Sequence, residues 1–117
     1  MRPLVAVVDD DPRIRDLLAS ELEDLGAEVL RCREGSELLQ NDRLNQVELV
    51  LLDWAMPGLD GETTLQALKG QAFRAPVVVV TALSDPQVTE TALQQGATET
   101  LLKTEALDRL PQLLSRG

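Results

Sequence analysis

The apolar run at residues 49–52, which ends directly in Asp53, constrains the fold of this chain most strongly. Because no polar residue interrupts the run and turn-forming residues follow it, it predicts a strand buried on both faces, as in a parallel sheet. Such sheets bind ligands at the carboxyl ends of their strands. We therefore expect Asp53 to be a reactive carboxylate, framed by a stiff turn at Pro57 and Gly58 and a second bend at Gly61.

The same pattern recurs along the chain. Short apolar runs occupy residues 4–8, 28–32, 76–81 and 99–102, the second being weaker because of its charged residues. The segments between them carry apolar residues at helical spacing. We expect helices from Pro12 to a stop at Gly26, from Ser36 to about Arg43, from Gly61 to Lys69 before a stop at Gly70, from Pro86 to a stop at Gly96, and from Glu105 onward. This alternation predicts an α/β fold with a parallel sheet and right-handed crossovers.

Three aspartates precede predicted helices and are expected to cap them: Asp11, Asp60 and Asp85. Thr104 is expected to cap the last helix. Pro111 lies within that helix, and proline removes a backbone donor and disfavours helix in the preceding residue. The terminal segment, residues 104–117, is therefore expected to be kinked or split at Pro111.

Length and charge limit the classes of function. A chain of 117 residues is expected to form one domain, residues 1–117. Eleven basic and twenty acidic residues give a net charge of −9, and Trp54 and Phe73 are the only aromatic residues. We expect no direct nucleic-acid binding, because the charge repels phosphates and the chain lacks aromatic platforms for bases.

Cysteine and histidine usage narrow the possibilities further. The single Cys32 cannot form an intrachain disulfide, which fits a reducing, cytoplasmic setting. We expect no signal peptide and no membrane contact, since no apolar run reaches membrane-spanning length. The absence of histidine excludes zinc–histidine sites, Ser–His or Cys–His catalysis, and a phosphohistidine on this chain.

Four of the five predicted strands end in polar side chains: Asp9 and Asp10, Asp53, Thr81, and Lys103. Parallel strands end at one edge of a sheet, so these side chains are expected to converge. Mg²⁺ prefers carboxylate oxygens, and a divalent cation would relieve the repulsion among crowded carboxylates. A carboxylate nucleophile next to a cation and a lysine has the groups that phosphoryl transfer requires.

Taken together, four motifs resemble the response-regulator receiver domain of two-component signalling. They are Val7-Val8-Asp9-Asp10, Asp53 with Met56-Pro57-Gly58-Leu59-Asp60-Gly61, Val80-Thr81-Ala82, and Leu102-Lys103. The resemblance covers residues 4 to about 110. It implies a three-layer, doubly wound, flavodoxin-like sheet with strand order 2-1-3-4-5 and helices on both faces, with the site between the first and third strands.

The resemblance also implies roles for the residues of the site. Asp53 would be the phosphoacceptor, and Asp9, Asp10 and Asp53 would hold Mg²⁺ with the backbone carbonyl of Ala55. Lys103 would pair with phosphoryl oxygens, and Thr81 would hydrogen-bond one of them. The chain would be a signalling phosphoacceptor that catalyses only its own phosphorylation and slow dephosphorylation.

Partners follow from the same resemblance. Because the chain has no histidine, the phosphoryl donor would be a phosphohistidine on a sensor histidine kinase or a phosphotransfer protein. The output would lie in a downstream protein target or a fused output domain.

The chain departs from the family pattern at several positions. Thr104 stands where the family usually has proline, so a trans peptide bond is expected after Lys103. Thr100 replaces a frequent Tyr or Phe, which removes an aromatic readout of the switch. Ala55 and Leu83 carry no polar group that could orient a hydrolytic water, so a fairly long-lived acyl phosphate is expected.

Three other classes of function are compatible with parts of the sequence or must be excluded. A receiver-like binding module could act without phosphorylation, which Thr100 and Thr104 favour mildly and the acidic residues oppose. A Mg²⁺-dependent phosphohydrolase could open with Asp9-Asp10-Asp11, but that leaves Asp53 unexplained. A dinucleotide-binding domain is excluded because no Gly-x-Gly-x-x-Gly follows the first strand.

Overall fold

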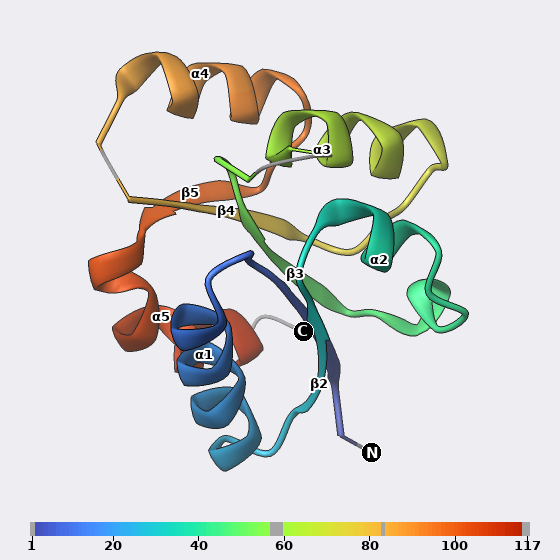
Figure 1. The fold of residues 1–117 in the computed structure, drawn as a ribbon, viewed down its shortest axis with the longest axis vertical. Helices are drawn as coiled ribbons and strands as arrows, with labels where there is room; N and C mark the ends of the chain where they lie inside the picture. Colours follow the sequence, from blue (N-terminus) through green and yellow to red (C-terminus); the bar gives the residue numbers. More distant parts are fainter. Residues whose placement is uncertain (1, 57–59, 83, 116–117) are drawn as a thin grey trace.

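The computed structural model describes residues 2–56, 60–82 and 84–115. Its centre is a five-stranded parallel sheet with the strand order β2-β1-β3-β4-β5, which confirms the predicted order. The strands are β1 (Leu4–Val8), β2 (Glu28–Cys32), β3 (Leu49–Asp53), β4 (Val77–Thr81) and β5 (Glu99–Leu102). Helices cover both faces of this sheet, as Figure 1 shows. The predicted three-layer architecture is therefore confirmed.

The helices divide unequally between the two faces. They are α1 (Pro12–Asp24), α2 (Gly35–Leu39), α3 (Gly61–Gly70), α4 (Pro86–Gln94) and α5 (Lys103–Ser115), with a short 3₁₀ helix at Leu44–Gln46. Figure 1 places α1 and α5 on one face and α2, α3 and α4 on the other. None of the described helices combines the length and apolar character that crossing a membrane requires.

The inner strands supply the core for both helical layers. Every residue of β1 and β3 is buried. Because side chains alternate along a strand, Val5 and Val7 pack toward α1 and α5, whereas Ala6 and Val8 pack toward α2, α3 and α4. Strands that must satisfy two apolar layers read as continuous hydrophobic runs, which explains why these segments were recognisable from sequence.

The three predicted aspartate caps are confirmed. Asp11 accepts a hydrogen bond from the Arg13 backbone N–H at 2.9 Å. Asp60 accepts one from the Thr63 backbone N–H at 2.8 Å and Asp85 one from the Gln87 backbone N–H at 2.9 Å. Gly26 and Gly96, with φ values of 97° and 108°, follow α1 and α4 as expected. After α3, which ends at Gly70, the residue with positive φ is Ala72.

The second helix is shorter than predicted. We expected a helix from Ser36 to about Arg43, but α2 ends at Leu39 and a separate 3₁₀ turn follows. The Asn41 side chain accepts a hydrogen bond from the Arg43 backbone N–H at 2.8 Å, a local bond that competes with the helical pattern. The Arg43 guanidinium then reaches Glu28 at 2.7 Å, a contact with another element that the local sequence could not indicate.

The last helix also differs from its prediction. It begins at Lys103, and the Glu105 carboxylate accepts a hydrogen bond from the Leu102 backbone N–H at 2.9 Å, so Thr104 is not the cap. The split expected at Pro111 is wrong, because α5 runs through that residue to Ser115. Leu110 and Leu113 are buried on either side of Pro111, and this packing outweighs the lost hydrogen bond. A bend at Pro111 stays a prediction.

Candidate functional site

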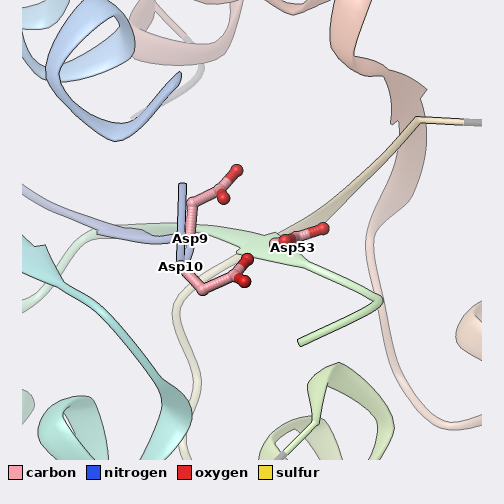
Figure 2. Close-up of side chains that lie close together, drawn as sticks. All are labelled: Asp9, Asp10 and Asp53. Atoms are coloured by element: carbon pink, nitrogen blue, oxygen red, sulfur yellow. The ribbon is translucent and has the colours of Figure 1, made fainter. Parts of the chain in front are cut away.

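The candidate site lies where β1 and β3 end side by side. Asp9 follows β1, and Asp53 is the last residue of β3. Figure 2 shows the carboxyl groups of Asp9, Asp10 and Asp53 close together at these strand ends. One oxygen from each lies within 4.8 Å of the others. The predicted convergence of the carboxylates is therefore confirmed.

Asp9 is held in place through its backbone N–H, its side chain and its carbonyl oxygen. Only 2 % of the residue is exposed, and its backbone N–H extends the sheet by donating to the Cys32 carbonyl at 3.0 Å. Its Oδ1 accepts a hydrogen bond from the Asp11 backbone N–H at 2.9 Å. Its carbonyl oxygen accepts one from the Arg15 guanidinium at 2.9 Å. Asp9 is thus a rigid anchor for the acidic loop, whereas Asp10 beside it is exposed.

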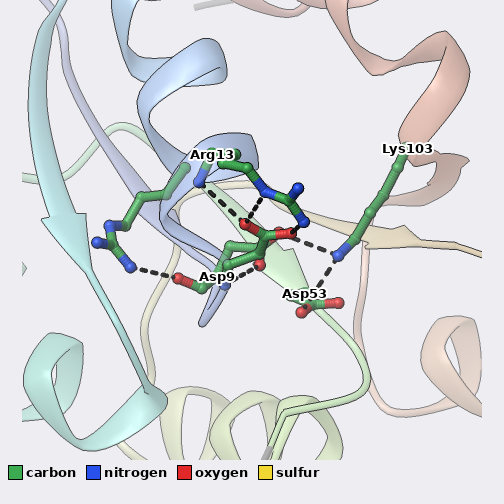
Figure 3. A network of polar contacts seen from close by, with 6 residues as sticks. Asp9, Arg13, Asp53 and Lys103 are labelled. Atoms are coloured by element: carbon green, nitrogen blue, oxygen red, sulfur yellow. Dashed lines mark hydrogen bonds and ion pairs between the residues drawn. The ribbon is translucent and has the colours of Figure 1, made fainter.

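Lys103 bridges two of the carboxylates. Its Nζ lies 3.2 Å from Asp9 Oδ2 and 3.4 Å from Asp53 Oδ2, as Figure 3 shows. The lysine is the first residue of α5 and not a strand residue, and the helix start directs its side chain across the ends of the strands. No cis peptide bond occurs among the described residues, so the trans bond predicted between Lys103 and Thr104 is confirmed.

Asp53 is a buried acid of the site with a raised pKa. It is 4 % exposed, and within the described part of the chain its Oδ2 has no hydrogen-bond partner besides the ion pair with Lys103. Burial, followed by the negative charge of Asp9, raises the pKa of Asp53 to about 7 despite Lys103. Burial lowers the pKa of Lys103, but the charges of Asp53 and Asp9 outweigh it and raise that pKa overall. A further cation at this position would favour the ionised form of Asp53.

Thr81 and Ala55 complete the predicted set. Thr81 is the half-buried last residue of β4, and the Trp54 backbone N–H donates to the neighbouring Val80 carbonyl at 3.2 Å. This contact places the end of β4 beside the residue that follows Asp53. Ala55 is exposed in the loop after β3. The turn predicted at Pro57 and Gly58, together with Leu59 and Leu83, lies outside the described residues.

The residues of the site fit a hard divalent cation. Asp9, Asp10 and Asp53 offer oxygen atoms from three carboxylates within one small volume, which is the donor chemistry that Mg²⁺ prefers. The buried Asp53 Oδ2, which lacks a hydrogen bond within the described chain, has unused acceptor capacity. Two of the three carboxylates are buried and close together, so binding a cation would relieve a real electrostatic cost.

Two further residues, Gly61 and Arg15, shape the site through contacts that the sequence motifs do not indicate. Gly61, expected only as a bend, donates its N–H to the Trp54 carbonyl at 3.1 Å. A Cβ atom on Gly61 would come within 2.5 Å of the Asp53 carbonyl oxygen. Arg15 binds the Asp9 backbone, a contact that carries no sequence motif because a carbonyl is present at every residue. The glycine had a weak sequence signal, and the arginine had none.

Thr100 lies at the seam between β5 and α4. Its hydroxyl oxygen is 3.3 Å from that of Thr89 on α4, and either group can donate the hydrogen bond. Both residues are half-buried. At this position the chain therefore has a polar contact between a strand and a helix.

Comparison with known proteins gives a consistent result. The family model described as response regulator receiver domain matches residues 5–115. The chain is 35 % identical to the DNA-binding transcriptional regulator NtrC of Escherichia coli over 99 % of its own length and 25 % of that protein. It is 34 % identical to the sensor histidine kinase RcsC of Salmonella typhi over 96 % of its own length and 12 % of that protein.

A solved structure agrees with these matches. The chemotaxis protein CheY4 of Vibrio cholerae superposes with a TM-score of 0.89 at 26 % identity, covering 99 % of this chain and 98 % of that one. The chain spans half or less of the length of the curated relatives that it matches first.

Proposed function

The chain belongs to the response regulator receiver domain family of two-component systems, and on that premise we propose that Asp53 accepts a phosphoryl group from a phosphohistidine of a partner protein, in a Mg²⁺-dependent transfer that switches the protein contacts of the chain. One observation supports this proposal most strongly. The buried Asp53 Oδ2, with no hydrogen bond within the described chain, lies 3.4 Å from the ammonium group of Lys103 and close to two further carboxylates.

The transfer is an in-line displacement at phosphorus. An oxygen of the Asp53 carboxylate attacks, the new O–P bond forms, and the P–N bond to the donor imidazole breaks. The imidazole leaves with the electron pair of that bond and takes up a proton from the solvent. The product is an acyl phosphate on Asp53, and catalysis consists of positioning and of balancing charge.

Lys103 supplies a positive charge where the transferred group gains negative charge. Its ammonium group lies between Asp9 and Asp53, so it is already placed at the edge of the reacting carboxylate. Such prearranged charge stabilises the transition state because no rearrangement is needed during the reaction. Thr81, at the end of the neighbouring strand β4, would donate a hydrogen bond to a phosphoryl oxygen.

Asp9, Asp10 and Asp53 would hold Mg²⁺, together with the backbone carbonyl of Ala55. Bound there, the ion would offset the charges of the carboxylates and of the phosphoryl oxygens. This matters for Asp53, because its raised pKa of about 7 leaves much of it protonated and non-nucleophilic near neutral pH. Lys103 shifts the pKa of Asp53 in the required direction, downward.

The partners follow from the chemistry and from the relatives. The chain has no histidine, so the donor would be a sensor histidine kinase or a phosphotransfer protein. By their names, the relatives include a sensor histidine kinase and a DNA-binding regulator. Output would pass to a downstream protein target or a fused output domain. With a net charge of −9, direct contact of this domain with nucleic acid or an anionic membrane is disfavoured. We also propose that it acts in the cytoplasm.

A second candidate is a receiver-like binding module that acts without phosphorylation. The observation that favours it is the hydroxyl contact between Thr89 and Thr100, which ties α4 to β5 where the family often has an aromatic side chain. The buried pair of carboxylates with Lys103 argues against it, because a module without chemistry gains nothing from this electrostatic cost.

Intact-mass measurement separates these functions. The protein is incubated with Mg²⁺ and acetyl phosphate, and Asp53→Asn is treated in parallel. A single phosphoryl adduct is expected on the wild type and none on Asp53→Asn, and chelating the metal should abolish the adduct. No adduct on the wild type would support the unphosphorylated module. Turnover of the donor that does not need Asp53 would indicate a phosphohydrolase instead.

A further inference from the structure

Arg15 lies on α1, half-buried, and its guanidinium donates a hydrogen bond to the backbone carbonyl of Asp9 at 2.9 Å. We infer that Arg15 is a positioning residue: it fixes the peptide group between Asp9 and Asp10 and thereby aims the Asp10 carboxylate at the cation site. This inference rests on the proposed function, because it concerns how the Mg²⁺ ligands are arranged.

The geometry of the peptide bond gives the reason. The carbonyl that Arg15 binds belongs to the planar group joining Asp9 to Asp10, so holding its oxygen sets the direction in which the chain leaves β1. The amide side of Asp9 is already held by the sheet through the Cys32 carbonyl at 3.0 Å. Asp10 itself is exposed. The direction of its side chain therefore depends on the backbone on either side of it.

The next peptide group is also held. The Asp11 backbone N–H donates to Asp9 Oδ1 at 2.9 Å, so the loop folds back onto the side chain that Lys103 contacts. Figure 3 shows these contacts converging on Asp9. Freeing the Asp9 carbonyl would let the peptide group rotate, and Asp10 would spend less time near Asp53.

The charge of Arg15 and its positioning role predict opposite changes in Mg²⁺ affinity when Arg15 is removed. A guanidinium next to the acidic loop repels a divalent cation, so its removal would strengthen Mg²⁺ binding if charge alone mattered. Loss of positioning would weaken binding. Residues that orient metal ligands typically contribute about 10- to 100-fold to metal affinity. The sign of the change therefore separates the two effects.

Arg13 provides a matched control on the same helix. Its side chain is 89 % exposed and pairs with Asp11 at 3.3 Å, whereas the hydrogen bond to the Asp9 carbonyl comes from Arg15. Arg13→Gln therefore removes the same charge close to the same loop while leaving the Asp9 carbonyl bound. The Asp11 cap on the Arg13 backbone N–H also survives this substitution.

The experiment measures Mg²⁺ binding by calorimetry and by the fluorescence of Trp54, which follows Asp53 in the chain. Arg15→Gln should weaken Mg²⁺ binding about tenfold or more, and Arg15→Lys, which keeps the charge and one donor, should recover part of it. Arg13→Gln should bind as tightly as the wild type or slightly more tightly. In metal-free protein, exchange of the Asp11 amide proton should be faster in Arg15→Gln than in Arg13→Gln.

The possible failures are distinguishable. If Arg15→Gln binds Mg²⁺ as tightly as the wild type, or more tightly, the positioning role is overturned while the proposed function stands. If the wild type does not bind Mg²⁺, the proposed function falls and this inference falls with it. Should Arg15→Gln not fold, Arg15→Met, which removes the charge and every donor, takes its place: unchanged affinity and unchanged Asp11 exchange would overturn the inference.

Discussion

Gly61, the first residue of α3, lies directly against the backbone of Asp53. A Cβ atom at Gly61 would approach the Asp53 carbonyl oxygen to 2.5 Å and the Trp54 Cα to 2.6 Å. The start of the helix and the end of the strand can lie this close only because the residue is glycine. The position of the candidate phosphoacceptor is therefore coupled to the position of α3.

The first prediction concerns this contact. Gly61→Ala should destabilise the protein by about 1–3 kcal/mol, because the extra methyl group meets backbone that cannot move aside cheaply. It should also slow phosphorylation from acetyl phosphate by displacing Asp53. Urea unfolding and the rate of adduct formation measure the two effects.

Gly70→Ala is the matched control. Gly70 is the last residue of α3, and a Cβ atom there would meet no atom of the described residues within 4 Å. Alanine is the better helix former by about 0.5–1 kcal/mol, so this variant should be equally or more stable. Equal stability of Gly61→Ala and the wild type would show that the backbone at Asp53 gives way easily.

The second prediction concerns Lys103. Replacing it with Met removes the only ammonium group at the described site while keeping a long side chain. We expect adduct formation on Asp53 to slow by about 100-fold, the scale associated with losing one prearranged stabilising group. Lys69→Met, which changes the only other lysine of the chain, should leave the rate unchanged. A normal rate in Lys103→Met would remove this residue from the proposed mechanism.

The third prediction concerns pH. The folded-state pKa of Asp53 is about 7, well above its ordinary value of 3.8. Between these values the folded protein keeps a proton that the unfolded chain has released, so stability falls as pH rises and levels off above about 7. Asp53→Asn removes this cost and should be more stable than the wild type, by an amount on the order of a few kcal/mol at about pH 8.

The advantage of Asp53→Asn should shrink as the pH falls toward 3.8 and disappear below it, where both states of the wild type carry the proton. Mg²⁺ should also reduce the difference at high pH, because it binds the folded wild type preferentially. Urea unfolding at several pH values, with and without Mg²⁺, measures both effects. A difference that does not change with pH would contradict the raised pKa.

The fourth prediction concerns the seam between α4 and β5. Thr89→Val and Thr100→Val each remove one hydroxyl of the pair and leave the other without this partner. A double-mutant cycle should give a coupling of about 0.5–1.5 kcal/mol, the usual contribution of such a hydrogen bond. A coupling near zero would mean that the 3.3 Å contact between the hydroxyls does not stabilise the seam.

Much of the fold was predictable because its signals are local. A strand buried on both faces must be apolar throughout, so residues 49–52 and 77–80 were recognisable as strands. A helix N-terminus needs a side-chain acceptor, so the caps at Asp11, Asp60 and Asp85 were predictable as well. The convergence of Asp9, Asp10 and Asp53 followed from one rule, that parallel strands end at the same edge.

The errors arose where a distant contact outweighs local preference. The segment after Leu39 leaves the helix as Asn41 binds locally and Arg43 reaches β2. The helix of Lys103 continues through Pro111 because Leu110 and Leu113 are buried beneath it. In the first place a local bond at Asn41 acts together with the distant contact between Arg43 and Glu28, and in the second the burial of Leu110 and Leu113 against other elements decides. The distant contacts form only when the whole domain has folded.

The alternation of strands and helices, and the acidic residues that end the first and third strands, could be predicted from the chain alone. These depend on hydrophobic pattern and capping, which act over a few residues. Four features arise only in the folded domain: the raised pKa of Asp53, the ion pair of Lys103 with Asp53, the tight contact at Gly61 and the hydrogen bond from Arg15 to Asp9. Each of these depends on burial or on a distance between separate elements.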